Sequence, residues 1–178
     1  MRIISGILKG KQLKIPKNIK VRPTTDQSKE AVFNILANRF DFGELKVLDL
    51  FSGTGSISFE FSSRGAQNVC SIDKNHNSTE FIKNFSDKNN LNIQVVRADI
   101  FKFRVQLNIK FNIIFADPPY SSREEYYYKI ISIVKEKFIT SKGALLILEH
   151  PENIDFSYNE NILERRKYGR CQFTFFNL

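Results

Sequence analysis

The chain has 178 residues, of which 42% are hydrophobic, and its net charge is +8, from 27 Lys and Arg against 19 Asp and Glu. That length suits one domain with a substantial core, and no apolar run approaches the roughly 20 residues that a membrane span needs. The two cysteines, Cys70 and Cys171, lie far apart in the sequence with no C-x-x-C motif or histidine cluster, so neither a disulfide framework nor a zinc site is indicated. We therefore expect a cytoplasmic protein without a metal.

The positive charge is concentrated at the start of the chain. Residues 1–30 hold eight basic side chains against Asp26 and Glu30, so this sixth of the sequence carries +6 of the +8. The basic residues are Arg2, Lys9, Lys11, Lys14, Lys17, Lys20, Arg22 and Lys29. Within residues 1–30, the segment "RIISGILKGKQLKIP" (2–16) predicts two short strands broken by glycines. We expect a basic β-hairpin extension over residues 1–22 that contacts an acidic partner, followed by one domain over residues 23–178.

The next segment, "VRPTTDQSKEAVFNILANRF" (21–40), predicts a helix. Thr24, Thr25 or Asp26 can cap its start, and apolar residues then recur at helical spacing. Those apolar residues are Ala31, Val32, Ile35, Leu36 and Phe40. This helix should pack on the main domain and carry the basic segment with it.

From residue 47 onward, strand patterns alternate with helix patterns. The predicted strands are 47–51, 69–73, 93–99, 111–117 and 144–150, and the predicted helices are 56–64, 77–89 and 124–138. Short connections between them predict a parallel sheet with helices on both faces. The tail differs, because "NILERRKYGRCQFTFFNL" (161–178) predicts two strands that turn at Tyr168-Gly169-Arg170 and form an antiparallel edge pair.

Acidic residues fall at the ends of four successive predicted strands: Asp49, Asp73, Asp99 and Asp117. The carboxyl ends of parallel strands form the edge where α/β sheets bind ligands. The glycine turn in "DLFSGTGSIS" (49–58) has Ser58 at the position where a dinucleotide-binding fingerprint has its third glycine. The acidic residue of this turn, Asp49, precedes the glycines, which favours a ligand that carries a cation. S-adenosylmethionine fits this pattern.

The three carboxylates before Asp117 match the polar groups of that ligand. Asp49 can accept its ammonium, Asp73 its ribose hydroxyls and Asp99 its adenine amino group, and the glycine turn leaves room for the ribose and the methionine. Each carboxylate taken alone is more often a surface group or a helix cap. Their shared position at four strand ends is what supports the assignment.

The segment "FNIIFADPPYSS" (111–122) places chemistry at the end of a buried strand. Its apolar run does not alternate, which predicts a strand covered on both faces, and two prolines then end the ladder. Asp117 and the carbonyl of Pro118 can accept the hydrogens of an amino group, and Tyr120 can stack on an extruded base. His76 and His150 have no evident catalytic partner and are interpreted as structural or surface residues.

The motifs "DLFSGTG", "SIDKN", "RAD" and "FADPPY" resemble the ordered motifs of Rossmann-like S-adenosylmethionine-dependent methyltransferases. "DPPY" is similar to the motif of enzymes that methylate exocyclic amino groups of nucleobases. Together with "MRIISGILKGKQL" and "VRPTTDQSKEAVFNIL", they resemble the bacterial 16S ribosomal RNA guanine-N2 methyltransferase family over nearly the whole chain. Gln27 and Lys29 stand where that family commonly has arginines, so no residue-specific RNA contact is assigned to them.

The resemblance implies an α/β fold of the class I methyltransferase type, with a mostly parallel seven-stranded sheet. It implies S-adenosylmethionine as cofactor, S-adenosylhomocysteine as product, and transfer to N2 of a guanine in 16S rRNA within the small ribosomal subunit or an assembly intermediate, by a monomer. The catalytic residues would be Asp117, Pro118, Pro119 and Tyr120. The cofactor would contact Asp49, Phe51, Gly53, Gly55, Asp73, Lys74, Asp99, Ile100 and Asp117. RNA would contact Arg2, Lys9, Lys11, Arg22 and Thr24.

Three other functions stay open at this point. A DNA adenine-N6 or cytosine-N4 methyltransferase shares the four-residue motif, although such enzymes usually carry a target-recognition domain for which 178 residues leave little space. A nucleic-acid-binding protein could keep the fold without catalysing a reaction, although five intact residues speak against this alternative: Asp49, Gly53, Gly55, Asp117 and Tyr120. A nicotinamide oxidoreductase is disfavoured by Ser58 and by the proline turn.

Overall fold

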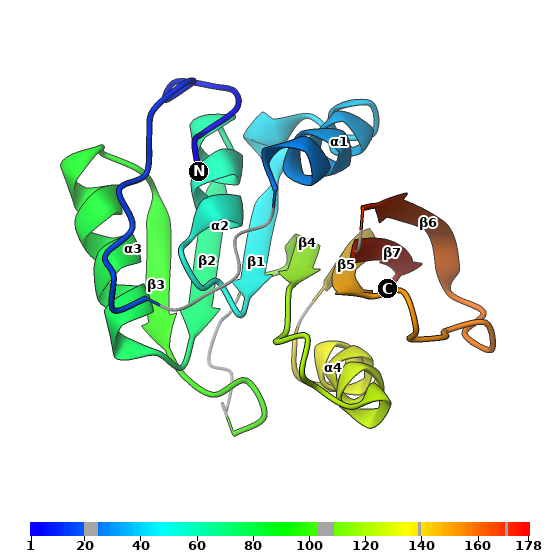
Figure 1. The fold of residues 1–178 in the computed structure, drawn as a ribbon. Coiled ribbons are helices and arrows are strands. Elements are labelled where there is room, and N and C mark those ends of the chain that lie inside the picture. Colours follow the sequence, from blue (N-terminus) through cyan, green and yellow to red (C-terminus); the bar gives the residue numbers. More distant parts are fainter. Residues whose placement is uncertain (20–24, 103–108, 139, 170) are drawn as a thin grey trace.

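The computed structural model describes residues 1–19, 25–102, 109–138, 140–169 and 171–178. Its centre is one seven-stranded sheet in the order β3-β2-β1-β4-β5-β7-β6 (Figure 1). Strands β1 to β5 pair in parallel, and β7 pairs antiparallel with both β5 and β6. The strands are β1 (Lys46–Leu50), β2 (Asn68–Asp73), β3 (Ile93–Arg97), β4 (Phe111–Ala116), β5 (Thr140–Pro151), β6 (Ile162–Tyr168) and β7 (Cys171–Asn177).

Within the described residues, four α-helices and one short 3-10 helix accompany these strands, with α1 and η1 preceding β1 and the other helices connecting parallel strands. They are α1 (Asp26–Ala37), η1 (Phe42–Glu44), α2 (Ser56–Ser63), α3 (His76–Lys88) and α4 (Glu124–Lys137). Thr25 caps α1, because its hydroxyl accepts the Ser28 backbone N–H at 3.2 Å, and Asn75 caps α3 in the same manner. The N-cap position of α2 is instead occupied by Gly55, which has no side chain to cap the helix.

Helices cover both faces of the sheet, as Figure 1 shows. One face packs α1 and α2 against β1, β4, β5 and β7, through residues such as Phe33, Phe61 and Phe115. The opposite face packs α4 against the same central strands, through residues such as Ile130 and Leu148. Helix α3 lies beside α2, where the rings of Phe59 and Phe85 are 4.4 Å apart. The central strands are therefore buried on both sides, which explains their unbroken apolar runs.

Residues 1–13 form a loop, called here the N-terminal loop, that packs on α2 and α3. A single antiparallel bridge joins Arg2 to Gln12, and the residues between them turn. The prediction of two short strands is wrong in this respect, because turns at Gly6 and Gly10, both at positive φ, occupy the middle of the segment. Its two ends do pair as in a hairpin, since the N–H of Ile3 donates to Lys11 O at 3.1 Å and the N–H of Leu13 to Met1 O at 3.0 Å. The loop also contributes to the core, because Ile3 and Leu13 are buried in a cluster that includes Ile82.

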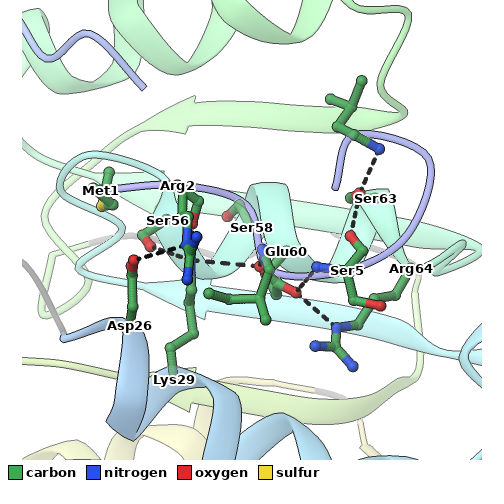
Figure 2. A network of polar contacts seen from close by, with 12 residues as sticks. Met1, Arg2, Ser5, Asp26, Lys29, Ser56, Ser58, Glu60, Ser63 and Arg64 are labelled. Atoms are coloured by element: carbon green, nitrogen blue, oxygen red, sulfur yellow. Dashed lines mark hydrogen bonds and ion pairs between the residues drawn. The ribbon is translucent and has the colours of Figure 1, made fainter. Parts of the chain in front are cut away.

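A buried ion pair fixes this loop on the domain (Figure 2). The side chains of Lys29 on α1 and Glu60 on α2 are completely buried, with Nζ and Oε2 3.4 Å apart. The Glu60 carboxylate accepts the backbone N–H groups of Ile4 and Ser5 at 2.8 and 3.0 Å, and Arg64 donates to it from the next turn at 2.8 Å. Lys29, which the sequence groups with the basic N-terminus, is therefore no part of a basic surface.

The remaining elements follow the predictions closely. Helix α1 starts within the predicted capping region, and the three later helices begin and end within one residue of expectation. Strand β3 stops at Arg97, two residues before the predicted end, and β5 begins at Thr140 rather than at residue 144. The antiparallel pair at the tail is confirmed, with β7 inserted between β5 and β6. Among the helices of the described residues, none is long and apolar enough to cross a membrane.

Candidate active site

The four acidic residues singled out in the sequence meet at one cavity of about 390 Å³. Asp49 lies near the end of β1, Asp73 ends β2, and Asp99 and Asp117 follow β3 and β4. Parallel strands bring these positions to the same edge of the sheet. The cavity is lined by Asp49, Phe51, Ser52, Gly53, Thr54, Ser56, Ile57, Ile72, Asp73, Lys74, Asn75, Ser78, Ala98, Asp99, Ile100, Phe115, Asp117, Pro118, Pro119, Tyr120 and Tyr126.

The turn between β1 and α2 forms one wall of the cavity. Gly53 adopts φ +54°, a left-handed conformation that favours glycine, and its N–H donates to Asp73 Oδ2 at 2.8 Å. The other oxygen of Asp73 accepts the N–H of Asn75 at 2.8 Å. Phe51 also has a positive φ, of 60°, which is strained for an aromatic residue. Asp73 thus holds two neighbouring turns in place while it lines the cavity.

Gly55 differs from Gly53, because it does not line the cavity. Its φ is +74°, and a Cβ there would lie 2.7 Å from Ile82 Cγ1 and 3.0 Å from the Phe59 ring. The residue therefore allows α2 to pack closely against α3. Contact between Gly55 and a cofactor stays a prediction.

Asp49 is almost completely buried, with 1% of its surface exposed. Its Oδ2 atom accepts the backbone N–H of Ser58 at 3.1 Å and the hydroxyl of Ser58 at 2.5 Å. Burial raises the pKa of Asp49 to about 7, although the two bonds from Ser58 oppose the rise. A cationic ligand group beside this carboxyl would favour its ionised form.

The segment after β4 forms a further part of the cavity wall, next to the end of β1. The N–H of Asp117 points toward Leu50 O at 3.5 Å, which ties the ends of β4 and β1 together. Pro118, Pro119 and Tyr120 continue the wall. The Tyr120 hydroxyl donates to Oε1 of Glu149 on β5 at 2.8 Å, and Glu149 is only 4% exposed.

Known proteins match this chain over nearly its whole length. The family described as Conserved hypothetical protein 95 matches residues 1–177. The chain belongs to this family. The ribosomal RNA small subunit methyltransferase D of Escherichia coli K12 is 31% identical over 150 residues, which cover 84% of this chain and 74% of the relative.

Solved structures show the same fold. The E. coli protein yhhF superposes with a TM-score of 0.83 at 26% identity, over 99% of this chain and 97% of that chain. The protein SMU.776, solved in complex with SAH, has a TM-score of 0.68 at 22% identity, over 84% of this chain and 49% of that chain. The Rossmann-like class I methyltransferase fold expected from the motifs is therefore confirmed.

The cavity of this Conserved hypothetical protein 95 member fits S-adenosylmethionine. Its volume lies in the range of about 300 to 1,000 Å³ that is typical of small-ligand sites. Its wall carries four carboxylates, a chemistry that can accept hydrogen bonds from ammonium, hydroxyl and amino groups, with apolar surface from Phe51 and Ile100. Within the described ranges, no group of three or more His, Cys, Asp or Glu is placed to hold a metal ion.

The predicted RNA contacts are spread over the family member's N-terminal loop. Arg2 is exposed and pairs with Asp26 at 3.3 Å, near the start of α1. Lys9 belongs to the tip of the loop, where its neighbour Leu8 donates to Ser63 at the end of α2, and Lys11 bonds Asn89 after α3. Because α2 begins at the cavity, this tip lies at its far end, about 12 Å along the helix axis. Arg22 and Thr24 fall outside the described residues.

The structure adds cavity residues that the sequence did not single out. Tyr126 on α4 packs on Phe51 and Phe101, with ring centroids 6.1 and 4.8 Å away, and closes the cavity from the α4 side. Its neighbours in the helical stripe belong to the core, so spacing alone could not distinguish it. Glu149, which does not line the cavity but bonds Tyr120 in its wall, was not singled out either. It lies near the end of a predicted buried strand, where its charge was the one unusual feature.

Proposed function

We propose that this protein transfers a methyl group from S-adenosylmethionine to N2 of a guanine in 16S rRNA. The observation that carries the proposal is that Asp117, Pro118 and Tyr120 share one cavity with Asp49 and the other strand-end carboxylates. The name of the E. coli relative, a ribosomal RNA small subunit methyltransferase, supports RNA of the small subunit as the substrate.

Three carboxylates orient the cofactor in this account. Asp49 accepts its ammonium, Asp73 its ribose hydroxyls and Asp99 its adenine amino group, while Lys74 and Ile100 complete the wall. S-adenosylmethionine supplies a methyl group on a positively charged sulfur and leaves as S-adenosylhomocysteine. The residues of the chain fix this methyl group opposite Asp117, so that orientation supplies much of the rate acceleration.

The amino group of guanine is a poor nucleophile, because its lone pair is delocalised into the ring. Asp117 and the carbonyl of Pro118 accept its two hydrogens and favour a pyramidal nitrogen, and the prolines hold both acceptors in place. Tyr120 stacks on the base. As the new N–C bond forms, the C–S bond breaks, and the proton released from nitrogen passes to Asp117 or to water.

The partner is RNA within the small ribosomal subunit or an assembly intermediate, contacted by the basic N-terminal loop of a monomer in the cytoplasm. A folded particle supplies shape that a single domain of this size can recognise without a separate target-recognition domain. The exposed Arg2, Lys9 and Lys11 provide phosphate contacts.

Transfer of a labelled methyl group tests this proposal. Small subunits from cells that lack the protein, naked 16S rRNA and duplex DNA are each incubated with labelled S-adenosylmethionine and either the wild type or Asp117→Ala. We expect label in rRNA with the wild type alone. Label confined to DNA would support a DNA amino methyltransferase instead, and tight cofactor binding without transfer would indicate a non-catalytic binding protein.

A further inference from the structure

Tyr120 connects the cavity to a buried carboxylate that does not line it. The residue forms part of the cavity wall, whereas its hydroxyl bonds Glu149 Oε1 at 2.8 Å. The last paired residues of β4 and β5 are Ala116 and Leu148, and both Asp117 and Glu149 lie one residue beyond them. The strand pairing thus brings Glu149 beside the segment Asp117–Tyr120, which follows β4.

The environment of Glu149 makes it a fixed acceptor. It is 4% exposed and faces Phe173 of β7, which is completely buried, across the antiparallel pairing. Burial raises the pKa of Tyr120, and the nearby Glu149 raises it further, so the phenol keeps its proton and remains a donor. A hydrogen bond from a phenol to a carboxylate in such a place is stronger and more directional than a neutral one.

We propose that Glu149 is a positioning residue for methyl transfer: by holding the Tyr120 hydroxyl, it sets the angle of the aromatic ring on which the target base stacks. This inference rests on the proposed function of the cavity. The two prolines fix the backbone before Tyr120, and the bond to Glu149 fixes the far end of its side chain. The ring is thereby held before the base arrives, which reduces the entropy lost on stacking.

Four variants separate this role from a merely structural one: Glu149→Leu, Glu149→Gln, Tyr120→Phe and the double variant Tyr120→Phe/Glu149→Leu. We expect Glu149→Leu to lower kcat/KM for RNA on the order of tenfold to a hundredfold, because small misplacements in an active site have effects of this size. Glu149→Gln should restore most of the rate, because its amide oxygen still accepts the hydroxyl. Cofactor affinity should be unchanged, because Glu149 does not line the cavity.

The double variant tests whether Glu149 acts through Tyr120. When Tyr120 has no hydroxyl, replacement of Glu149 should cause no further loss of activity, so the two effects should not add. Additive effects, or full activity of Glu149→Leu beside an active wild type, would overturn the inference and leave the proposed function standing. An inactive wild type would instead refute the proposed function.

Thr174→Val is the matched control for lost stability. Thr174 is completely buried on β7, and its hydroxyl bonds His150 Nε2 at 2.8 Å, on the residue next to Glu149. The control should lose stability without losing kcat. The ring is followed directly by ¹⁹F NMR of protein labelled with 3-fluorotyrosine, with the Tyr120 signal assigned from Tyr120→Phe. Glu149→Leu should shift and broaden that signal, and an unchanged signal would contradict the inference.

Discussion

Lys29 and Glu60 form an ion pair whose side chains are both fully buried, and the backbone of residues 2–5 completes their hydrogen bonds. Lys29 Nζ donates to Arg2 O at 2.7 Å and to the hydroxyl of Ser56, which lines the cavity, at 3.2 Å. Burial lowers the pKa of Lys29, while Glu60 opposes that change. One buried cation thus joins the N-terminal loop, α1 and the first turn of α2.

Lys29→Met should therefore destabilise the protein and release the loop. Removal of one partner leaves the Glu60 carboxylate buried without its cation, which typically costs about 3 to 5 kcal/mol. Urea unfolding measures this loss, and trypsin should cleave faster after the exposed Lys9. Lys29→Met/Glu60→Gln should recover part of the stability. If the single variant were as stable as the wild type, the assigned role of this pair would be wrong.

The packing of α2 against α3 should not tolerate a side chain at Gly55. Gly55→Ala combines a left-handed backbone with a Cβ 2.7 Å from Ile82 Cγ1. Gly10→Ala is the matched control, because Gly10 has a similar φ of +82° and nothing within 4 Å. The free energy of unfolding of the control should fall by about 1 to 2 kcal/mol because of backbone strain alone. Gly55→Ala should lose more in the same thermal unfolding experiment, and equal losses would argue against the close contact.

Cofactor binding should depend on pH through Asp49. The pKa of Asp49 is raised to about 7 by burial, with a small further rise from the nearby Asp73. An ammonium favours the ionised carboxylate, so the pKa of Asp49 is lower in the complex than the value of about 7 in the free protein. At a pH between these two pKa values, binding releases a proton from Asp49. Affinity should therefore fall as the pH falls below 7, by up to about tenfold per unit.

Calorimetry from about pH 5.5 to 8.5 measures this dependence, with buffers of different ionisation enthalpy to count the protons. Asp49→Asn is the control, and its affinity should be lower and nearly independent of pH. A wild-type affinity that stayed constant over this range would show that Asp49 does not contact the cofactor cation.

Lys9 and Lys11, at the tip of the N-terminal loop, should contribute to the binding of long RNA substrates but not of short oligonucleotides. Lys9 and Lys11 lie at the far end of α2 and α3 from the cavity, so a short oligonucleotide at the cavity does not reach them. Lys9→Glu/Lys11→Glu should weaken binding of the 16S rRNA and reduce the salt dependence by about one unit of slope per lost phosphate contact. Lys135→Glu, on the exposed side of α4, is the control. Unchanged affinity and slope would exclude the tip from the RNA interface.

Local signals explain why much of this molecule could be predicted from its sequence. The unbroken apolar run of β4, the prolines that end it and the glycines after β1 each specify backbone geometry within a few residues. Because parallel strands end at a common edge, the meeting of Asp49, Asp73, Asp99 and Asp117 followed from strand order.

The features that escaped prediction depend on contacts between distant segments. Lys29 appeared as one of many lysines, and only the packing of α1 on α2 pairs it with Glu60. Glu149 meets Tyr120 because β5 lies next to β4, which the sequence of either strand does not encode. The N-terminal loop takes its shape from bonds to Glu60 and Ser63 as well as from the short antiparallel pairing of its own two ends.

Mass spectrometry of nucleosides from 16S rRNA tests whether this protein methylates N2 of a guanine in the cell. Ribosomal RNA is compared from cells that lack the protein and from the same cells complemented with the wild type or with Asp117→Ala. We expect N2-methylguanosine to be reduced in the deletion strain, restored by the wild type and not restored by Asp117→Ala. An unchanged N2-methylguanosine content in the deletion strain, with loss of a different methylated nucleoside or of none, would contradict it.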